Sequence, residues 1–225
     1  MSPGAKHLAA ADPLLGAFIE RHGPIKRAVP EHPEPYHALL SAVAHQQLHG
    51  KAALTILGRL KVLTGDSLPS PEALLALPDE ALRGCGFSGN KAAALRDIAE
   101  KAVAGVVPSR ARAQRLSDAE LIKRLVSIRG VGQWTVEMLL IFTLNRPDVF
   151  PVDDFGVREG YRALHGLAAQ PKPRPFAELG MIYAPYRSLA ARYLWRAADL
   201  AKPPPKPKKT AGSKLPAAVR RIAKA

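Results

Sequence analysis

Cysteine is almost absent from this chain of 225 residues, since Cys85 is the only one. A single thiol cannot form an intrachain disulfide, a cysteine-based zinc site or an iron–sulfur cluster. No helper residues cluster near Cys85 in the sequence, so we interpret it as a small buried hydrophobic residue rather than a nucleophile. This composition is compatible with a reducing cytoplasm, where we expect the protein.

Long hydrophobic runs are also missing. The longest apolar run, residues 138 to 142, is far shorter than the roughly 20 residues that cross a bilayer. Residues 1 to 13 contain no apolar core of a signal peptide, so we expect a soluble protein with no membrane partner. No segment alternates apolar and polar residues over a useful length. The fold class that we predict is therefore all-α.

Acidic residues are few, at 19 against 33 Lys and Arg, which leaves a net charge of +14 and a pI near 10.2. Such a balance is typical of proteins that bind polyanions. Residues 201–225 contain no acid and contribute +8 of the +14, and four prolines between 203 and 207 favour an extended chain. We predict a domain at 1–200 and a basic arm at 201–225 that adds salt-sensitive affinity for DNA. A solvated tail without a role, or an RNA-binding arm, stays open.

Residues 117 to 156 are the most informative stretch. Ser117 and Glu120 have the spacing of a capping box, which predicts the start of a first helix. The turn at 128–132 contains two glycines, which allow positive φ and leave backbone N–H groups uncovered. A second helix, at 134–144, is almost wholly apolar and is expected to be buried. Backbone amides at the start of this helix form a site for an anion such as phosphate.

Helical spacing of apolar residues and start signals such as Asp12 predict further helices, with loops at the proline-rich stretches. We expect helices at residues 12–21, 36–47, 51–63, 72–77, 80–84, 90–104, from 153 or 154 to 164, 176–183 and 186–200. The polar segment 45–50 between two of them has the composition of an ordinary helix–helix corner. From the residues alone, that interpretation is favoured.

Several segments together resemble a known family. The hairpin I-R-G-V-G resembles the L-P-G-V-G turn of the helix-hairpin-helix motif, although Arg129 replaces the usual proline. Asp154, in F-P-V-D-D-F, lies 20 residues after Trp134. Three further segments contribute to the resemblance. They are Gln46-Gln47-Leu48 with the following Lys-Ala-Ala, the stretch from Leu82 to Lys91, and the C-terminal P-Y-R-S-L-A-A-R-Y-L-W. Over residues 12 to 200 the chain resembles the helix-hairpin-helix DNA glycosylase superfamily, and within it the 3-methyladenine DNA glycosylase II (AlkA-like) family.

The resemblance implies a two-lobed helical fold, with the hairpin at 117–144 and the active-site cleft between the lobes. We expect no extra N-terminal α/β domain of the kind that longer bacterial relatives carry. It also implies an enzyme that extrudes a base from duplex DNA and cleaves its N-glycosidic bond. Asp154 would be the catalytic carboxylate, although an Asp at a helix start is ordinarily a cap, and we assign capping or support to Asp153.

The remaining roles follow from the same resemblance. Gln47 would fill the gap that the extruded nucleotide leaves, with Gln46, Leu48 and His49 beside it as further DNA-binding residues. The DNA strand would be held at the hairpin by Arg129, Gly130, Val131 and Gly132. Backbone carbonyls of Val126, Ile128 and Val131 match those that bind Na⁺ or K⁺ in relatives, and no other cofactor is expected. Ser88 and Lys91 are minor candidates for a phosphate contact, and the segment around them is otherwise a plain connection.

The pocket residues are expected to be Trp134, Met138, Phe155 and Trp195. Without the resemblance, Trp134 would be interpreted as a core residue. Alkylation makes a base cationic, and an indole face favours a stacked cation by about 0.5–2 kcal/mol. Bifunctional relatives have a Lys where this chain has Trp134, so we expect a monofunctional enzyme without lyase activity. Met138 and Arg196 stand where some relatives have aromatics, which leaves the range of substrates open.

Our first hypothesis is a monomeric, monofunctional glycosylase that removes alkylated bases from double-stranded DNA. Its substrates would be chiefly 3-methyladenine, together with 7-methylguanine and methylated pyrimidines. The alternatives are a noncatalytic helix-hairpin-helix DNA-binding protein and a mismatch-specific glycosylase. The lack of cysteines opposes the iron–sulfur branch of the superfamily. In a bacterium, the protein would be associated with the nucleoid.

Overall fold

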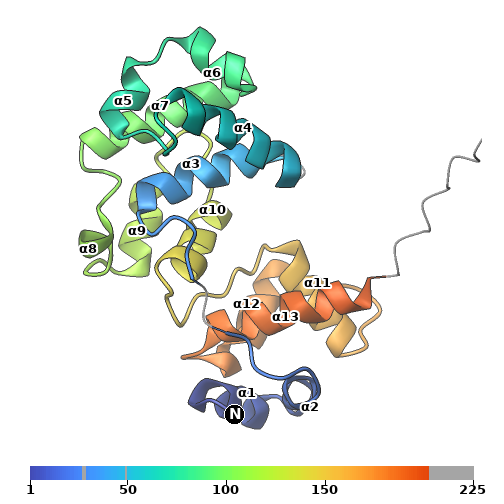
Figure 1. The fold of residues 1–225 in the computed structure, drawn as a ribbon. Coiled ribbons are helices and arrows are strands. Elements are labelled where there is room, and N and C mark those ends of the chain that lie inside the picture. The colour runs from blue at the N-terminus through green and yellow to red at the C-terminus, as the bar shows by residue number, and fades with distance from the viewer. Residues whose placement is uncertain (27–28, 49, 203–225) are drawn as a thin grey trace, which may run out of the picture.

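The structure is a computed structural model that describes residues 1–26, 29–48 and 50–202, and this part of the chain contains helices and turns but no strand. Almost all of the predicted basic arm, 201–225, lies outside the described residues, so the arm and the domain boundary at 200 stay predictions. Figure 1 shows two lobes of helices joined side by side. No helix in the described residues combines the length and the apolar character needed to cross a membrane.

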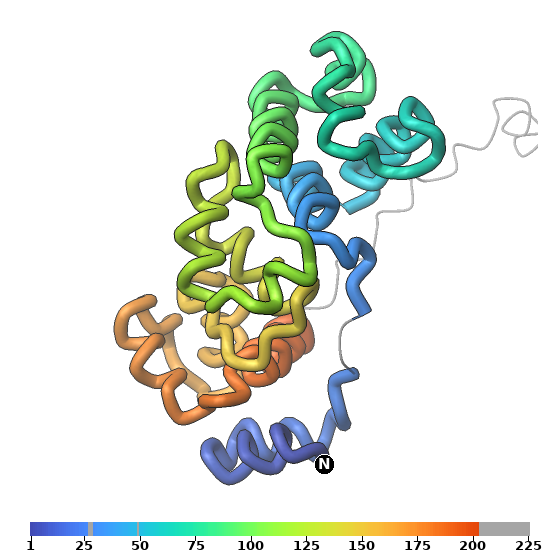
Figure 2. The backbone as a smooth tube through the Cα atoms, turned by 90° about the vertical axis from the view of Figure 1, so that its left-hand side faces the viewer, coloured from blue at the N-terminus to red at the C-terminus, as the bar shows by residue number. Residues whose placement is uncertain are grey.

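The chain passes from one lobe to the other and back. The terminal lobe contains both ends of the described chain, and the hairpin lobe contains the middle (Figures 1 and 2). Helices of the hairpin lobe are α3 (Pro35–His45), α4 (Gly50–Leu63), α5 (Pro71–Ala76), α6 (Asp79–Cys85), α7 (Gly89–Val103), α8 (Arg110–Ala113), α9 (Asp118–Leu125), α10 (Gln133–Met138) and the π-helical turn η1 (Leu139–Thr143). Those of the terminal lobe are α1 (Pro3–Ala11), α2 (Pro13–His22), α11 (Phe155–Leu164), α12 (Pro173–Leu179), the 3₁₀ turn η2 (Gly180–Tyr183) and α13 (Arg187–Ala201).

Most helix starts are set by side chains next to them in the sequence. Asp12 accepts hydrogen bonds from the first amides of α2, and Ser117 and Glu120 form the predicted capping box of α9. Because these contacts span three residues at most, the sequence pattern was sufficient to predict them. Helices α1 and α8 were not predicted. Each begins after a serine cap, Ser2 and Ser109, but α8 has only four residues, and α1 has one large aliphatic residue, Leu8, so neither shows an apolar periodicity.

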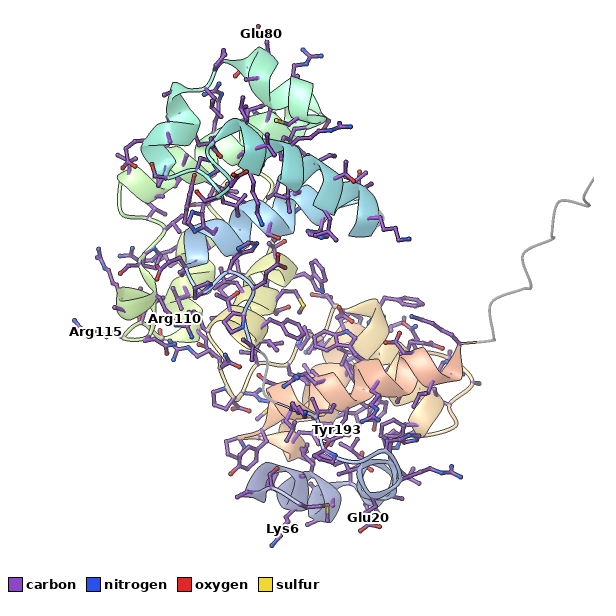
Figure 3. The ribbon with its side chains drawn as sticks, in the orientation of Figure 1. Lys6, Glu20, Glu80, Arg110, Arg115 and Tyr193 are labelled. Carbon is purple, nitrogen blue, oxygen red and sulfur yellow. The ribbon has the colours of Figure 1, made fainter. Side chains whose placement is uncertain are left out.

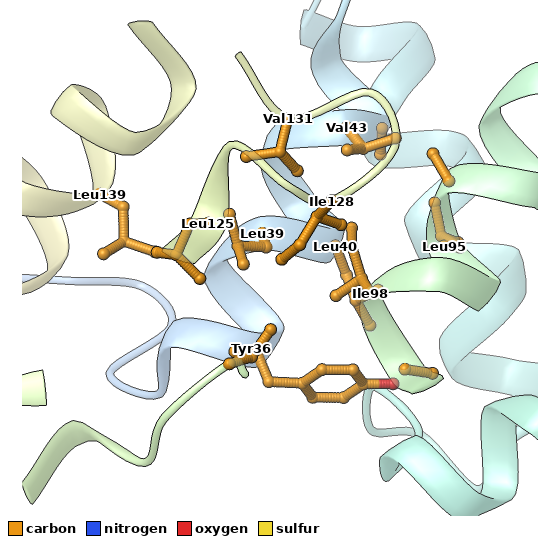
Figure 4. Packing of buried hydrophobic residues seen from close by; sticks show 14 of the residues in the cluster. Tyr36, Leu39, Leu40, Val43, Leu95, Ile98, Leu125, Ile128, Val131 and Leu139 are labelled. Atoms are coloured by element: carbon orange, nitrogen blue, oxygen red, sulfur yellow. The ribbon is translucent and has the colours of Figure 1, made fainter. Parts of the chain in front are cut away.

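The core of the hairpin lobe fixes the position of the hairpin. Figure 4 shows residues of α3 and α7 packed against Leu125, Ile128, Val131 and Leu139. Ile128 and Val131 are only 2% and 4% exposed, so the two ends of the turn are anchored in the core. The residues between them, Arg129 and Gly130, are exposed.

The core of the terminal lobe lies between α13, α11 and the two N-terminal helices. Tyr193, labelled in Figure 3, is buried on α13. The Tyr183 hydroxyl donates a hydrogen bond of 2.6 Å to the carboxylate of Asp12, which joins η2 to the start of α2. Helix α11 crosses α13 so closely that a Cβ at Gly160 would overlap the backbone carbonyl of Leu194.

Gly160→Ala should therefore lower the free energy of unfolding by about 1–3 kcal/mol or more, because backbone atoms cannot move aside as a flexible side chain can. Urea unfolding followed by circular dichroism measures the effect. Gly58→Ala in α4 is the matched control, since no atom lies within 4 Å of its added Cβ. In that helix the same substitution should stabilise the protein by about 0.5–1 kcal/mol. Equal effects of the two substitutions would refute the close approach at Gly160.

Candidate active site

The carboxylate of Asp154 is buried, with 8% of the residue exposed, and it accepts three N–H hydrogen bonds. One oxygen accepts from the amide of Val157 at 2.8 Å and from Nε1 of Trp195 at 2.8 Å. The other accepts from Nε1 of Trp134 at 2.6 Å. Asp154 is thus the N-cap of α11 and also the acceptor of two indole groups. Capping alone requires only the Val157 bond, so the two indoles are what distinguish this carboxylate from an ordinary cap.

The sequence left the start of this helix open between Asp153 and Asp154, and Asp154 is the cap, so the capping role expected for Asp153 was wrong. The alternative role of Asp153, support for the site, stays a prediction. Asp153 is exposed, and its backbone carbonyl accepts a long hydrogen bond of 3.5 Å from Arg158. The helix begins one residue later than capping by Asp153 requires, at Phe155, because the chain turns inward at Asp154. The two neighbouring carboxyl groups therefore have opposite environments, one buried and one in solvent.

The loop before Asp154 is held against α13. Both carboxylate oxygens of Asp148 accept hydrogen bonds of 2.8 Å from the Arg187 guanidinium. These bonds lower the pKa of Asp148, so the pair stays ionised at neutral pH. Ser188 fixes the same loop through its hydroxyl, which accepts from the amide of Val149 at 2.9 Å. Because the loop is fixed, Asp154 has a defined position relative to Trp195 on α13.

The two tryptophans approach Asp154 from different lobes. Trp134 lies in the first turn of α10 and is 49% exposed, so our expectation that this helix is buried from its first residue was wrong. Trp195 packs against both hydrophobic cores. Its ring lies 5.5 Å from that of Phe142, in the π-helical turn that follows α10. The indole groups thus join the two lobes around one carboxylate.

Two adjoining cavities lie along α3 and α10, and both are open to solvent. We call the one that borders Gln46, Gln47 and Trp134 the outer cavity, and the one that does not border them the inner cavity. The outer cavity, of about 500 Å³, is lined by Ala42, His45, Gln46, Gln47, Trp134, Thr135 and Met138. The inner cavity, of about 270 Å³, shares Ala42, Thr135 and Met138 with it and extends to Val29, His32 and Phe142. Met138 therefore lines both cavities and Trp134 lines the outer one, while their role in binding a base stays a prediction. Trp195 and Phe155 line neither cavity, and Phe155 is 69% exposed.

The segment after α3 is bonded to the hairpin. The side-chain amide of Gln46 donates a hydrogen bond of 2.8 Å to the carbonyl of Gly130. Gln47 has a φ of 57°, a conformation that few residues other than glycine adopt, and Leu48 is 39% exposed. His49, the fourth residue expected here, lies outside the described residues. Gln47 is thus held at the rim of the outer cavity, where a residue that fills a gap in DNA would have to be.

Two of the three N–H donors of the Lys91 ammonium group are used within the protein. Its Nζ donates hydrogen bonds of 2.8 and 2.7 Å to the carbonyls of Ala44 and Gln46 at the end of α3. Burial lowers the pKa of Lys91. Ser88 is likewise occupied as the N-cap of α7. Lys91 thus supports the Gln46 segment.

The hairpin presents its amides outward. Gly130 has a φ of +75°, whereas Gly132 has an ordinary φ of −90°, so only one of the two glycines uses positive φ. The Arg129 amide donates to the carboxylate of Asp97 at 2.6 Å, and the Val131 amide donates to Ile128. Within the described part of the chain, the amides of Gly130 and Gly132 have no acceptor. They are the amides available to an anion.

Asp97 and Glu137 are two acidic residues that the sequence did not single out. Asp97 lies 32 residues before its partner Arg129, so no local pattern could reveal the contact. Glu137 is 5% exposed, and burial raises its pKa against the opposing effect of a hydrogen bond from Gln133. The charges of Asp153 and Asp154 raise this pKa further. Because a raised pKa favours the neutral form of Glu137, it reduces the repulsion between the Glu137 and Asp154 carboxyl groups.

These features define a class of protein. Unpaired amides on a glycine turn bind phosphate, the Gln47 segment stands at the rim of a cavity, and a buried carboxylate lies beside it. The sequence pattern of the HhH-GPD superfamily of base excision DNA repair proteins matches residues 40–184. The chain belongs to this superfamily, and its all-α, two-lobed fold is the one predicted.

Three known proteins show the relationship in more detail. DNA-3-methyladenine glycosylase 1 of Schizosaccharomyces pombe is 47% identical over 182 residues, which cover 80% of each chain. The structure of Mag1 from the same yeast in complex with abasic DNA matches with a TM-score of 0.79 at 42% identity, covering 89% of this chain and 98% of Mag1. A DNA-3-methyladenine glycosidase of Bacillus halodurans matches with a TM-score of 0.80 at 36% identity, covering 88% and 89% of the two chains.

Lys91→Met should lower the free energy of unfolding by about 1–3 kcal/mol, because it leaves the Ala44 and Gln46 carbonyls without their donor. Urea unfolding measures this loss. Lys51→Met, at an exposed position in the first turn of α4, is the control and should have little effect. If both variants unfold at the wild-type urea concentration, Lys91 does not support the end of α3.

Proposed function

We propose that this protein is a monofunctional DNA glycosylase that hydrolyses the N-glycosidic bond of alkylated bases in base excision repair. Its main substrate would be 3-methyladenine, and 7-methylguanine and other methylated bases would also be released. The observation that carries the proposal is the buried carboxylate of Asp154, held by two indole N–H groups beside the outer cavity. The names of the relatives support the same reaction.

The arrangement suits a reaction on an extruded nucleotide. The amides of Gly130 and Gly132 hold a strand through its phosphates, and Gln47 fills the gap in the base stack. When the C1′–N bond breaks, its electron pair leaves with the base and positive charge develops on the sugar. Asp154 stabilises that charge and orients the water that adds at C1′. Because its position is fixed by three hydrogen bonds, little reorganisation is needed as the charge develops.

An aromatic wall at the cavity favours bases that carry a positive charge. Trp134 lines the outer cavity, and its indole face attracts a cationic base through its electron-rich ring. Alkylated purines are cationic, and they are also good leaving groups. A stronger attraction for the damaged base than for a neutral one therefore gives selection without a large set of base-specific hydrogen bonds.

The product should be an abasic site in an intact strand. Strand cleavage by bifunctional relatives proceeds through a Schiff base on a lysine, which this chain replaces with Trp134. The amine of Lys91 is occupied by the Ala44 and Gln46 carbonyls. Hydrolysis by water is therefore the reaction that the site supports.

Asp154→Asn should lower the rate of base release from methylated DNA at least about 100-fold, because the charge that stabilises the sugar cation is lost. Asparagine is also a good N-cap, so α11 should remain folded and duplex binding should stay near wild type. Chromatography of the released bases under single-turnover conditions measures the rate. Asp153→Asn removes the same charge one residue away, in solvent, and should release bases at the wild-type rate.

The alternatives give different results in the same assay. Wild-type activity in Asp154→Asn would overturn the catalytic assignment. If the wild type binds duplex DNA but releases no base, a noncatalytic DNA-binding protein is favoured. Release of undamaged adenine or thymine from mispairs would indicate a mismatch-specific glycosylase instead.

We also propose that Na⁺ or K⁺ binds the carbonyls of Val126, Ile128 and Val131. Among the described residues, no backbone N–H donates to Val126 or Val131, and the carbonyl of Ile128 accepts only the bond from Val131. All three therefore have lone pairs for a cation, which carbonyl oxygens can coordinate. The expected monomeric state and cytoplasmic location stay predictions.

Replacement of K⁺ by tetramethylammonium at constant ionic strength should weaken duplex binding, because the large cation cannot reach the three carbonyls. Fluorescence anisotropy with a labelled duplex measures the affinity. Constant ionic strength keeps the screening of phosphates equal, so the comparison isolates the specific ion. Equal affinities in the two salts would argue against a cation at the hairpin.

A further inference from the structure

The inner cavity has a polar end that the proposed function does not use. Its walls come from α3, α10 and η1, and include Leu39, Leu139 and Phe142. The connection between the lobes lines it with Glu31 and His32, and also with Val29, which is 93% exposed, so this part of the cavity is open to solvent. From the sequence, this proline-rich connection was expected to be only a loop, so none of these residues was considered as part of a site.

His32 is a histidine without a hydrogen-bond partner. Its side chain is 14% exposed, and within the described residues its buried Nε2 has no hydrogen bond. The nearest opposite charge is an oxygen of Glu31 at 3.6 Å, which is beyond hydrogen-bond distance. Burial lowers the pKa of His32 despite this carboxylate, and Lys61, His37 and His45 lower it further. The ring is therefore neutral at neutral pH, with one nitrogen that donates and one that accepts.

A buried polar atom without a partner costs stability, so Nε2 of His32 needs a partner, which water or a ligand in the adjoining cavity supplies. The inner cavity shares Ala42, Thr135 and Met138 with the outer cavity. A base that enters past Gln47 and Trp134 would therefore pass Met138 on its way to His32.

Two aromatic rings connect the inner cavity to Asp154. Phe142 lines this cavity, and its ring lies 5.5 Å from the ring of Trp195. The Nε1 of Trp195 in turn donates to Asp154. A purine whose sugar lies at Asp154 could thus direct its far edge into the inner cavity.

We propose that His32 is a specificity-determining residue whose Nε2 contacts the group at C6 of the extruded purine. That group is an amino donor in adenine and a carbonyl acceptor in guanine, so a neutral imidazole distinguishes the two. The inference rests on the proposed glycosylase function. It adds a means of distinguishing 3-methyladenine from 7-methylguanine. Stacking on Trp134 cannot distinguish these two bases, because both are cationic in DNA.

The test is the ratio of 3-methyladenine to 7-methylguanine released from one sample of methylated DNA by the full-length protein. Single-turnover rates for both bases are measured by chromatography. His32→Phe keeps a planar ring and removes both nitrogens, whereas His32→Gln restores a polar group. His22→Phe is the matched control, because His22 is a half-buried histidine of the terminal lobe whose ring lies 4.3 Å from that of Phe18.

His32→Phe should change the ratio of the two rates at least about fivefold, which is the effect of one neutral hydrogen bond. His32→Gln should return the ratio toward wild type, and His22→Phe should leave it unchanged. A loss of preference for 3-methyladenine would identify Nε2 as the acceptor of the adenine amino group. A gain in that preference would identify it as the donor to the guanine carbonyl.

Other outcomes overturn the inference. If His32→Phe and His32→Gln lower both rates equally and leave the ratio unchanged, His32 only supports the fold. If His32→Phe does not fold, an unchanged ratio in His32→Asn refutes the proposal, because the shorter side chain cannot reach the same atom. Release of neither base by the wild type would instead overturn the proposed function itself.

Discussion

The carboxylate of Asp154 is the centre on which the arrangement of the two lobes depends. A buried negative charge is stable only with hydrogen-bond donors around it, and here the donors come from three separate elements. They are the first turn of α11, Trp134 of the hairpin lobe and Trp195 of α13. Because one donor belongs to the hairpin lobe and the others belong to the terminal lobe, the same contacts that stabilise the charge also fix the lobes relative to each other.

The surface that would contact DNA is built as one connected unit. Ile128 and Val131 anchor the hairpin in the core, and Gln46 joins the hairpin to the segment that carries Gln47. Lys91 holds the other side of that segment. The exposed amides and the exposed side chains thus stand on a rigid base. Rigidity matters here because an extruded base and the fixed carboxylate must meet with little freedom to adjust.

Much of the architecture could be predicted because its causes are local. The capping box at Ser117, the cap at Asp12 and the apolar spacing of α3 and α4 each operate within a few residues. The prediction failed where tertiary contacts decided the outcome. Capping or support was expected of Asp153, although Asp154 turns inward and is the cap. The helix of Trp134 was expected to be buried, although the first turn of α10 borders a cavity.

The sequence by itself determined the helical class, the hairpin with its glycine turn, and Asp154 as the candidate carboxylate. Caps, turns and helix periodicity depend on neighbours along the chain, and the resemblance to a family supplied the role of Asp154. Only the tertiary structure decided that two indoles 20 and 41 residues away donate to that carboxylate, and that Asp97 holds the hairpin amide. It also placed His32 in the lining of the inner cavity. Such contacts depend on how the helices pack, and side-chain packing between distant segments leaves no periodic signal in a single sequence.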